Sequence, residues 1–212
     1  MPQSTHLSKP GQNQRGTPAE AGKALSEHPR IGSITFTGSV ETGRAIIRAS
    51  AEHVKPVVLE LGGKSPQIVF ADGDLDRAAS EFDRGYFVSP TVFDCVSSEM
   101  SIAREEIFGP VLSVLVFSGD EEAANIANDS KYGLAAGVFT SDIDRAMRFA
   151  RDIQAGYVMI NECFTCGPGS PFGGYKQSGI GRERGLLALQ NYTQVKNVVV
   201  RVRQCSPGPK GK

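Results

Sequence analysis

The sequence contains no tryptophan, only four cysteines and no excess of charge of either sign. Lysine plus arginine and aspartate plus glutamate each number 23 among 212 residues, so no basic field attracts nucleic acid or an anionic membrane. No apolar run approaches the length of a membrane span, and residues 1–15 lack the apolar core of a secretory signal. We therefore expect a cytoplasmic protein with no nucleic-acid partner and no membrane partner.

The four cysteines are too few and too scattered for a disulfide framework in a chain of this length. Cys163 and Cys166 form a CxxC pair, but a zinc ribbon needs a second pair and a thioredoxin-like site needs a strand-to-helix setting. Because neither context is present, we predict no metal site and no redox role for this pair. The other two cysteines are Cys95 and Cys205.

The composition, with 40% hydrophobic residues and 24 glycines, is that of an ordinary globular protein. Segments with the period of a strand alternate with segments of helical period. This alternation predicts an α/β fold with mainly parallel sheets. The expected strands are 31–37, 57–61, 67–70, 91–96, 111–117, 157–160 and 194–202. The expected helices are 17–25, one entered through 38–43, then 120–128, 142–154 and 181–189.

Two of these elements carry more detailed predictions. The run 111–117 is so apolar that we expect it at the centre of a sheet, covered on both faces. In the helix 142–154, Ser141 and Asp144 are predicted to form a capping box. The predicted apolar face of that helix consists of Ile143, Met147, Ala150 and Ile153.

Four short strings carry the candidate chemistry, and the first is 35–39. It ends a strand and enters a helix at Gly38 and Ser39, with Gly43 about one turn further on. Small residues at a helix N-terminus let backbone N–H groups approach a phosphate, which the helix dipole also attracts. A serine at such a position more often caps the helix. Capping and phosphate binding therefore both stay open for this string.

The second string, 58–66, places Glu60 at the end of an apolar strand, just before Gly62 and Gly63. Burial disfavours the charged form of a carboxyl group, and a raised pKa suits a general base. An ion pair between Glu60 and Lys64 at a turn is the alternative. On spacing alone, neither interpretation is preferred.

The third string, 104–110, places Glu106 two residues before Phe108 and a Gly-Pro turn. Taken alone, this pattern is typical of a solvated charged turn.

The fourth string, 171–179, is too glycine-rich for a core strand and too specific for a linker. Loops of this kind often line sites.

Together and in this order, the four strings resemble the NAD(P)-dependent aldehyde dehydrogenase family, over residues 17–202. The resemblance implies a remnant of that family's fold, NAD or NADP as cofactor and an aldehyde as substrate. It implies that Glu60 is the general base that activates the hydrolytic water, and that residues 161–172 form part of the substrate entrance. The implied cofactor contacts are Gly38, Ser39 and Gly43 at the pyrophosphate, Leu61 and Gly62 near the nicotinamide, Glu106 at its ribose, and Phe108 against its ring.

The resemblance is interrupted after residue 80. In the family, the helix that begins like the one at Asp74 continues into the segment with the nucleophilic cysteine. Here residues 80–84 run directly into 85–91, which resemble the far side of the catalytic domain. The upstream half of the cofactor domain also has no counterpart, so we expect an internally deleted and N-terminally truncated member of the family. Cys163 and Cys166 are the nearest cysteines by region, but none of the four stands in the nucleophile motif.

The expected organisation follows from this interruption. Residues 1–15 are a disordered leader, 16–80 a partial dinucleotide-binding domain, and 204–212 a flexible tail. Residues 85–203 are a partial catalytic domain with returning cofactor-domain and oligomerisation elements. We expect weak cofactor binding and an impaired or lost oxidation of aldehydes to carboxylic acids. Because the strand 194–202 resembles the arm through which family subunits pair, the alternative is a non-catalytic interaction module that pairs with itself or with a full-length homologue.

Overall fold

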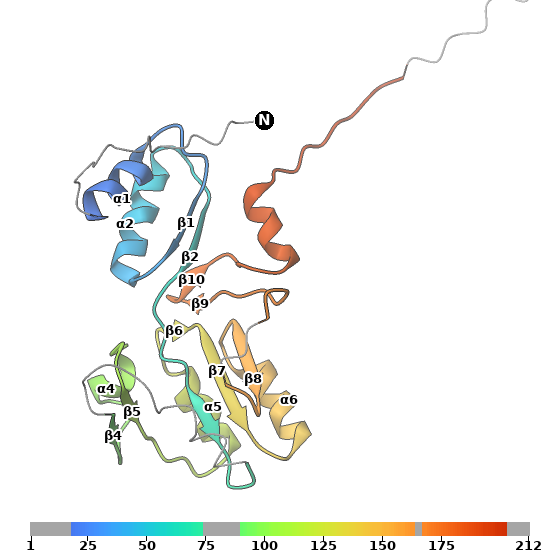
Figure 1. Ribbon diagram of the computed structural model, residues 1–212. Coiled ribbons are helices and arrows are strands. Elements are labelled where there is room, and N and C mark those ends of the chain that lie inside the picture. Colours follow the sequence, from blue (N-terminus) through green and yellow to red (C-terminus); the bar gives the residue numbers. More distant parts are fainter. Residues whose placement is uncertain (1–17, 74–89, 164–166, 203–212) are drawn as a thin grey trace, which may run out of the picture.

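A computed structural model describes residues 18–73, 90–163 and 167–202, and these residues form two lobes, one above the other in Figure 1. The fold is α/β with mainly parallel strands, as predicted. Among the helices of these residues, none has both the length and the apolar character needed to cross a membrane. The predictions for 1–15, for the helix beginning at Asp74 and for 204–212 lie outside the described residues.

The upper lobe contains a three-stranded sheet in the order β1-β2-β10, with two helices beside it (Figure 1). β1 and β2 are parallel, with Thr37 opposite Glu60, while β10 is antiparallel to β2 and places Gly179 opposite the same glutamate. The end of β2 is therefore held from both sides. The elements are α1 (Pro18–Glu27), β1 (Ile34–Thr37), α2 (Val40–Ala51), β2 (Val57–Glu60) and β10 (Gly179–Ile180).

Lys55 fixes the start of β2 against the end of α1. Its side chain is buried, and its ammonium group donates to the carbonyl oxygens of Ser26 at 2.7 Å and His28 at 2.8 Å. The last carbonyl groups of a helix have no partner within the helix and carry the negative end of its dipole. One buried cation thus binds two carbonyl groups at and just beyond the end of α1.

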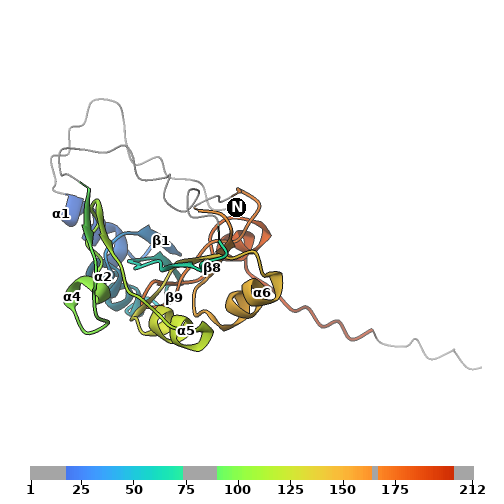
Figure 2. The same cartoon turned by 90° about the horizontal axis from the view of Figure 1, so that it is seen from below.

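The lower lobe contains an all-parallel sheet in the order β3-β7-β8, and two helices pack on it. In Figure 2 both helices lie on the same side of this sheet. The middle strand β7 is buried at every position, as a central parallel strand requires. The elements are β3 (Gln67–Val69), α5 (Asp120–Asn128), β7 (Ala135–Phe139), α6 (Ile143–Asp152) and β8 (Tyr157–Ile160).

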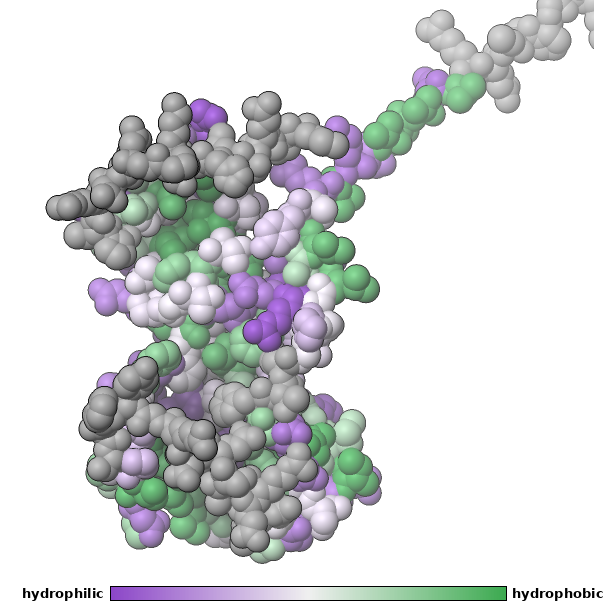
Figure 3. Space-filling model, in the orientation of Figure 1, coloured by the Kyte–Doolittle hydropathy of each residue, from purple (hydrophilic) through white to green (hydrophobic). Residues whose placement is uncertain are grey.

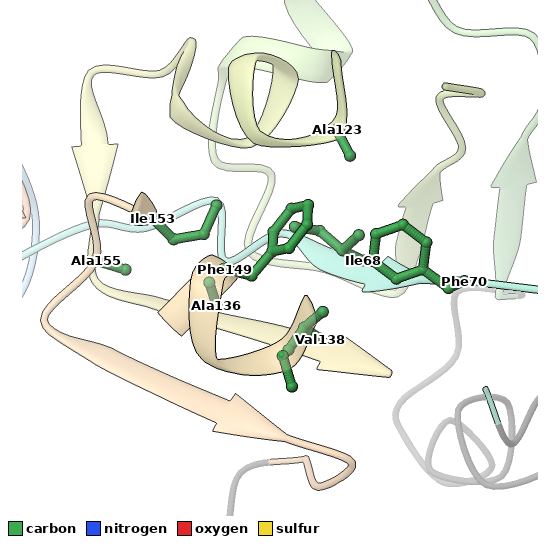
Figure 4. Packing of buried hydrophobic residues seen from close by; sticks show 9 residues of the cluster. Ile68, Phe70, Ala123, Ala136, Val138, Phe149, Ile153 and Ala155 are labelled. Atoms are coloured by element: carbon green, nitrogen blue, oxygen red, sulfur yellow. The ribbon is translucent and has the colours of Figure 1, made fainter. Parts of the chain in front are cut away.

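The main hydrophobic core belongs to this lower lobe. The ring of Phe70 lies edge-on to those of Phe117 and Phe149, at 5.3 Å between centroids in both pairs. Figure 4 shows Phe149 of α6 and Ile68 of β3 directed into the same space, with Ala123 of α5 above them. Residues far apart in the sequence therefore close one core.

The remaining elements are short. β4 and β5 pair in parallel with each other, and β6 and β9 form an antiparallel pair between the two lobes. Their bounds are β4 (Thr91–Phe93), α4 (Ser101–Arg104), β5 (Val111–Ser113), β6 (Tyr132–Gly133), β9 (Tyr175–Lys176) and the 3-10 helix η1 (Leu186–Tyr192).

The prediction of a central strand at 111–117 is wrong. Within the described residues, β5 pairs only with β4, ends at Ser113, and leaves Leu112 45% exposed and Val116 77% exposed. An apolar run indicates that a segment favours burial, but burial also requires neighbours that cover it. The predicted strands 31–37 and 91–96 are likewise shorter in the structure, where they begin at Ile34 and end at Phe93.

The helix α6 forms where predicted, but its cap and its buried face differ from the prediction. Asp142 caps the helix by accepting from the N–H groups of Asp144 and Arg145, while the Ser141 hydroxyl donates to Asp72 instead. Ile143 and Met147 are 65% and 58% exposed. Ile153 is buried as predicted, and it forms the buried face together with Ala146 and Phe149. The packing of Phe149 on Phe70 sets this rotation of the helix.

The predicted helix 181–189 is also wrong, because residues 181–185 form no helix and the 3-10 helix η1 begins only at Leu186. Gly181, Arg184 and Gly185 have positive φ angles of 87°, 58° and 55°, which an α-helix does not accommodate.

Residues 193–202 form no strand, although 194–202 was predicted as one. They are extended and exposed, and Figure 3 shows their hydrophobic side chains along a projecting segment. A strand requires a paired neighbour, and the described residues provide none beside this segment.

Candidate functional site

Glu60 is a buried carboxylate at the end of β2, near the junction of the two lobes (Figure 1). Its side chain is 4% exposed, and neither carboxylate oxygen has a hydrogen-bond partner among the described residues. Burial raises the pKa of Glu60 from 4.5 to about 7; the nearby Glu183 adds to the increase, while Arg182 and Arg184 oppose it. The alternative ion pair between Glu60 and Lys64 is not formed in the described part of the chain.

A glycine makes room for the Glu60 carboxylate. A Cβ atom added to Gly173 would lie 2.8 Å from Glu60 Oε1, so only a residue without a side chain fits there. Phe172 and Glu183 hold this glycine in place through a pair of backbone hydrogen bonds of 2.8 and 2.7 Å. The glycine-rich string 171–179 therefore forms one wall of the site, as such loops often do.

The string 35–39 lies beside Glu60 through the backbone. The N–H of Gly38 donates to the carbonyl oxygen of Glu60 at 3.0 Å, which places the start of α2 next to the end of β2. The Ser39 hydroxyl accepts from the N–H of Thr42 at 3.1 Å, so Ser39 caps α2. The capping interpretation is confirmed, and α2 directs its N-terminus toward the site.

The second part of the site joins Gly43, Leu61, Gly62 and Glu106. A Cβ atom added to Gly43 would lie 2.7 Å from Leu61 Cδ1, which shows how closely α2 approaches β2. A Cβ atom added to Gly62 would lie 2.6 Å from Glu106 Oε2, and Glu106 Oε1 accepts from the N–H of Gly63 at 3.2 Å. Glu106 is exposed, as expected for a solvated turn, yet it contacts the turn that follows Glu60.

Lys64 extends this cluster. Partial burial lowers the pKa of the Lys64 ammonium group, and the negative charge of Glu106 opposes that effect.

The structure brings together seven of the eight residues singled out from the sequence, from Gly38 to Glu106. Phe108 is the exception, because it is 94% exposed with a φ angle of 54° and is directed into solvent.

The segment expected at the substrate entrance lies on the lower lobe. Asn161 follows β8 and exchanges two hydrogen bonds of 2.9 Å with the backbone of Thr140. Cys163 is half-buried, with its Sγ 4.0 Å from Oε1 of Gln67 in β3. Residues 164–166, which include Cys166, lie outside the described residues. The contact of Cys163 is thus with the sheet of the lower lobe, whereas Glu60 belongs to the upper sheet.

Sequence reasoning missed Ser178, which is fully buried and joins three parts of the site. Its hydroxyl donates to the carbonyl oxygen of Gly62 at 2.5 Å and accepts from the N–H of Gly133 at 2.9 Å. Its carbonyl oxygen accepts from the N–H of Leu61 at 2.8 Å. The only signal in the sequence is a serine inside a glycine-rich string, which does not reveal these partners.

A dinucleotide fits the arrangement of these residues in part. The N-terminus of α2 provides backbone donors for a pyrophosphate, and the close approach at Gly43 and Gly62 leaves the backbone accessible. Glu106 Oε2 provides an acceptor for a ribose hydroxyl beside Gly62. Within residues 18–73, 90–163 and 167–202, no group of three or more histidine, cysteine, aspartate or glutamate side chains could hold a metal ion.

Comparison with known proteins assigns the chain to a family. The model of the aldehyde dehydrogenase family matches residues 14–83 and 79–198, so the chain belongs to this family. Aldehyde dehydrogenase family 2 member B4, mitochondrial, of Arabidopsis thaliana is 36% identical over 271 residues, with 87% of this chain and 50% of the relative covered. Betaine aldehyde dehydrogenase of Brucella anthropi is 35% identical over 270 residues, and the alignment covers 85% of this chain and 55% of the relative.

Solved structures give the same result. The NAD+ complex of aldehyde dehydrogenase from Bacillus cereus superposes with a TM-score of 0.81 at 35% identity, over 86% of this chain and 55% of that one. NAD-dependent aldehyde dehydrogenase from Sinorhizobium meliloti gives a TM-score of 0.83 at 32% identity, and the superposition covers 89% of this chain and 54% of that one. The predicted family and the predicted remnant of its fold are confirmed.

The chain spans about half the length of the curated relatives it matches. The alignment with the Arabidopsis relative is longer than the 212-residue chain, so a block of that relative has no counterpart here. The two segments matched by the family model meet at residues 79–83. Both observations agree with the interruption predicted after residue 80.

Proposed function

We propose that this chain keeps the base half of an aldehyde dehydrogenase active site and does not oxidise aldehydes by itself. The observation that carries the proposal is Glu60, a buried carboxylate without a hydrogen-bond partner among the described residues and with a pKa of about 7. It stands at the position that the family resemblance assigns to the general base. No cysteine of the sequence stands in the nucleophile motif.

The chemistry of the family explains why the base alone is insufficient. A thiolate attacks the aldehyde, donors hold the resulting oxyanion, a hydride leaves, and a base activates the water that hydrolyses the thioester. A carboxylate with a pKa near 7 is well suited to take a proton from that water at neutral pH. Glu60 fills this last role, but without a thiolate no thioester is formed for the water to attack.

The same residues define the proposed cofactor site. Gly38, Ser39 and Gly43 would face the pyrophosphate, Leu61 and Gly62 the nicotinamide, and Glu106 its ribose. A bound nicotinamide cofactor supplies the hydride acceptor. Phe108 would have to turn from solvent to pack against the ring.

Cofactor binding should be weak, because the contacts proposed among the described residues reach only the pyrophosphate, the nicotinamide and its ribose. Each buried hydrogen-bonding partner that is not matched costs on the order of 1 to 3 kcal/mol, so several together lower affinity by orders of magnitude. Calorimetric titration of the purified chain with NAD and with NADP should give no micromolar binding. A micromolar dissociation constant for either would contradict this part of the proposal.

The activity test uses the purified full chain, simple aldehydes, and NAD or NADP, with the nicotinamide absorbance followed over time. We expect no aldehyde-dependent signal, while the Bacillus cereus relative serves as the positive control in the same assay. Saturable reduction of the cofactor that Glu60→Gln abolishes would refute the proposed loss of turnover. In that event, Cys163→Ser and Cys166→Ser would identify which thiol had replaced the family nucleophile.

A second candidate function is a non-catalytic module that pairs with another family subunit. Residues 193–202 favour it, because they are extended, unpaired among the described residues, and rich in exposed valine, from Val198 at 71% to Val195 at 103%. The proposed partner is a second copy of the chain or a full-length homologue. An exposed apolar strand can add to the sheet edge of a partner.

Co-expression with a full-length family member tests this second function. We expect the two chains to co-purify, and Val198→Asp with Val200→Asp to abolish co-purification, because a charge is costly in a buried sheet. Lys196→Glu, which changes charge on the same segment without removing apolar surface, is the control. A chain that elutes as a monomer and leaves the homologue unbound would exclude the module.

A further inference from the structure

Ser178 is the most completely buried polar residue near Glu60, with no exposed surface. Its N–H donates to the carbonyl oxygen of Tyr175 at 3.0 Å, which closes a tight turn in the string 171–179. Its hydroxyl and carbonyl groups bond to Leu61, Gly62 and Gly133, as described above. One residue thereby connects the glycine-rich string, the end of β2 and the strand β6.

The hydroxyl uses its one donor and one of its two acceptor positions. A hydroxyl group has one donor, which Gly62 takes, and the N–H of Gly133 occupies an acceptor position. A Cβ atom added to Gly174 would clash with Ser178 Cβ, so Gly174 packs directly against this serine. Loss of the hydroxyl would remove this partner from the carbonyl group of Gly62 and from the N–H of Gly133.

These bonds fix the backbone next to Glu60. The N–H of Leu61 and the carbonyl group of Gly62 are both held by Ser178, and the next residue, Gly179, is paired with Glu60 in β10. The direction of the Glu60 side chain depends on this stretch of backbone. The same stretch contains the two residues that face the proposed nicotinamide site.

We propose that Ser178 is a positioning residue, which holds the end of β2 so that the Glu60 carboxylate stays buried against Gly173. The inference rests on the proposed role of Glu60 as the base. Ser178 touches neither the carboxylate nor a substrate position, and acts only through the backbone of residues 61 and 62. Without its hydroxyl, the end of β2 moves and water reaches Glu60.

A purely structural serine would affect stability but not the environment of Glu60, and Thr140 provides the matched control. Its hydroxyl is also buried, donates to Asp72 and accepts from the N–H of Asp142 at 3.2 Å. It belongs to the lower lobe, where it is the residue directly after β7. Thr140→Val removes a buried hydroxyl at constant shape, as Ser178→Ala removes the other.

The test is a titration of Glu60 in the full chain by carbon NMR of labelled glutamate carboxyl groups. In Ser178→Ala, the midpoint should fall from about 7 toward 4.5 by about one pH unit, because water then solvates the charged form. Thr140→Val should leave the midpoint unchanged. A midpoint that is unchanged in Ser178→Ala, or that moves equally in both variants, would overturn the positioning role.

A second measurement on the unmodified chain remains decisive if Ser178→Ala does not fold. If Ser178 ties β2 to β6, the amide protons of Leu61 and Gly133 exchange through one common opening and have the same free energy of exchange. Exchange of Gly133 without Leu61 would overturn the proposal. Failure of the base role has a different signature, namely a Glu60 midpoint near 4.5 in the unmodified chain.

Discussion

Replacement of Glu60 by glutamine should remove a pH dependence of stability that the native chain shows between about pH 4.5 and pH 7. The folded pKa of Glu60 lies above its unfolded value, so the folded state binds the proton more tightly. The stabilising contribution is complete below pH 4.5 and is lost as the pH rises through 7. The free energy of unfolding should therefore decrease across this window.

The magnitude follows from the pKa. The pKa of Glu60 rises from 4.5 in the unfolded chain to about 7 in the folded chain. This difference lowers the free energy of unfolding by roughly 3 kcal/mol when Glu60 changes from the protonated to the ionised form. The conversion applies because Glu60 is only 4% exposed and is therefore weakly screened. Relative to a domain stability of about 5 to 15 kcal/mol, this is a large contribution from one side chain.

The assay is urea unfolding of the native chain and of Glu60→Gln at a series of pH values. Subtraction of the two curves removes the contribution of every other carboxyl group. The difference should change by roughly 3 kcal/mol between pH 4.5 and 7.5. Glu52→Gln makes the same charge change at an exposed position and is the control. A flat difference for Glu60→Gln would refute the raised pKa and, with it, the argument for a base.

Three further outcomes test the fold. Asp142→Ala should lower the free energy of unfolding by about 1 kcal/mol in urea titrations, because α6 loses its N-cap; no change would contradict that cap. Phe139→Ala should cost about 3 to 5 kcal/mol, whereas Phe108→Ala, at an exposed phenylalanine, should cost less than about 0.5 kcal/mol. In hydrogen exchange of the isolated chain, residues 193–202 should exchange at rates close to those of an unfolded peptide, and protection there would indicate a paired strand.

The part of the site around Glu60 could be predicted because its signals are local. A carboxylate at the end of an apolar strand, two glycines after it and a capped helix before it are all visible in the order of the residues. Glu106 could be assigned to the same site only through the family resemblance, because its contact with Gly63 joins positions 43 residues apart in the sequence. The partners of Ser178, up to 116 residues away, could not be predicted for the same reason.

The errors in the fold have a common physical origin. The apolar run 111–117 and the segment 194–202 were predicted from their own composition, but pairing and burial depend on neighbours. In α6, the large side chains Ile143 and Met147 suggested one face, while the packing of Phe149 against Phe70 selected another. The local spacing of apolar residues identifies a helix or strand, and tertiary contacts decide its rotation and its partners.

The buried ammonium group of Lys55 makes this lysine an internal reporter of opening in the upper lobe. Acylating reagents need an accessible amine, and the Lys55 amine is occupied by the carbonyl oxygens of Ser26 and His28 at the end of α1. Exposed lysines such as Lys23, whose side chain is 73% exposed, should be modified at once. Lys55 should react only when α1 separates from β2, so its modification rate in mass spectrometry measures how often that separation occurs.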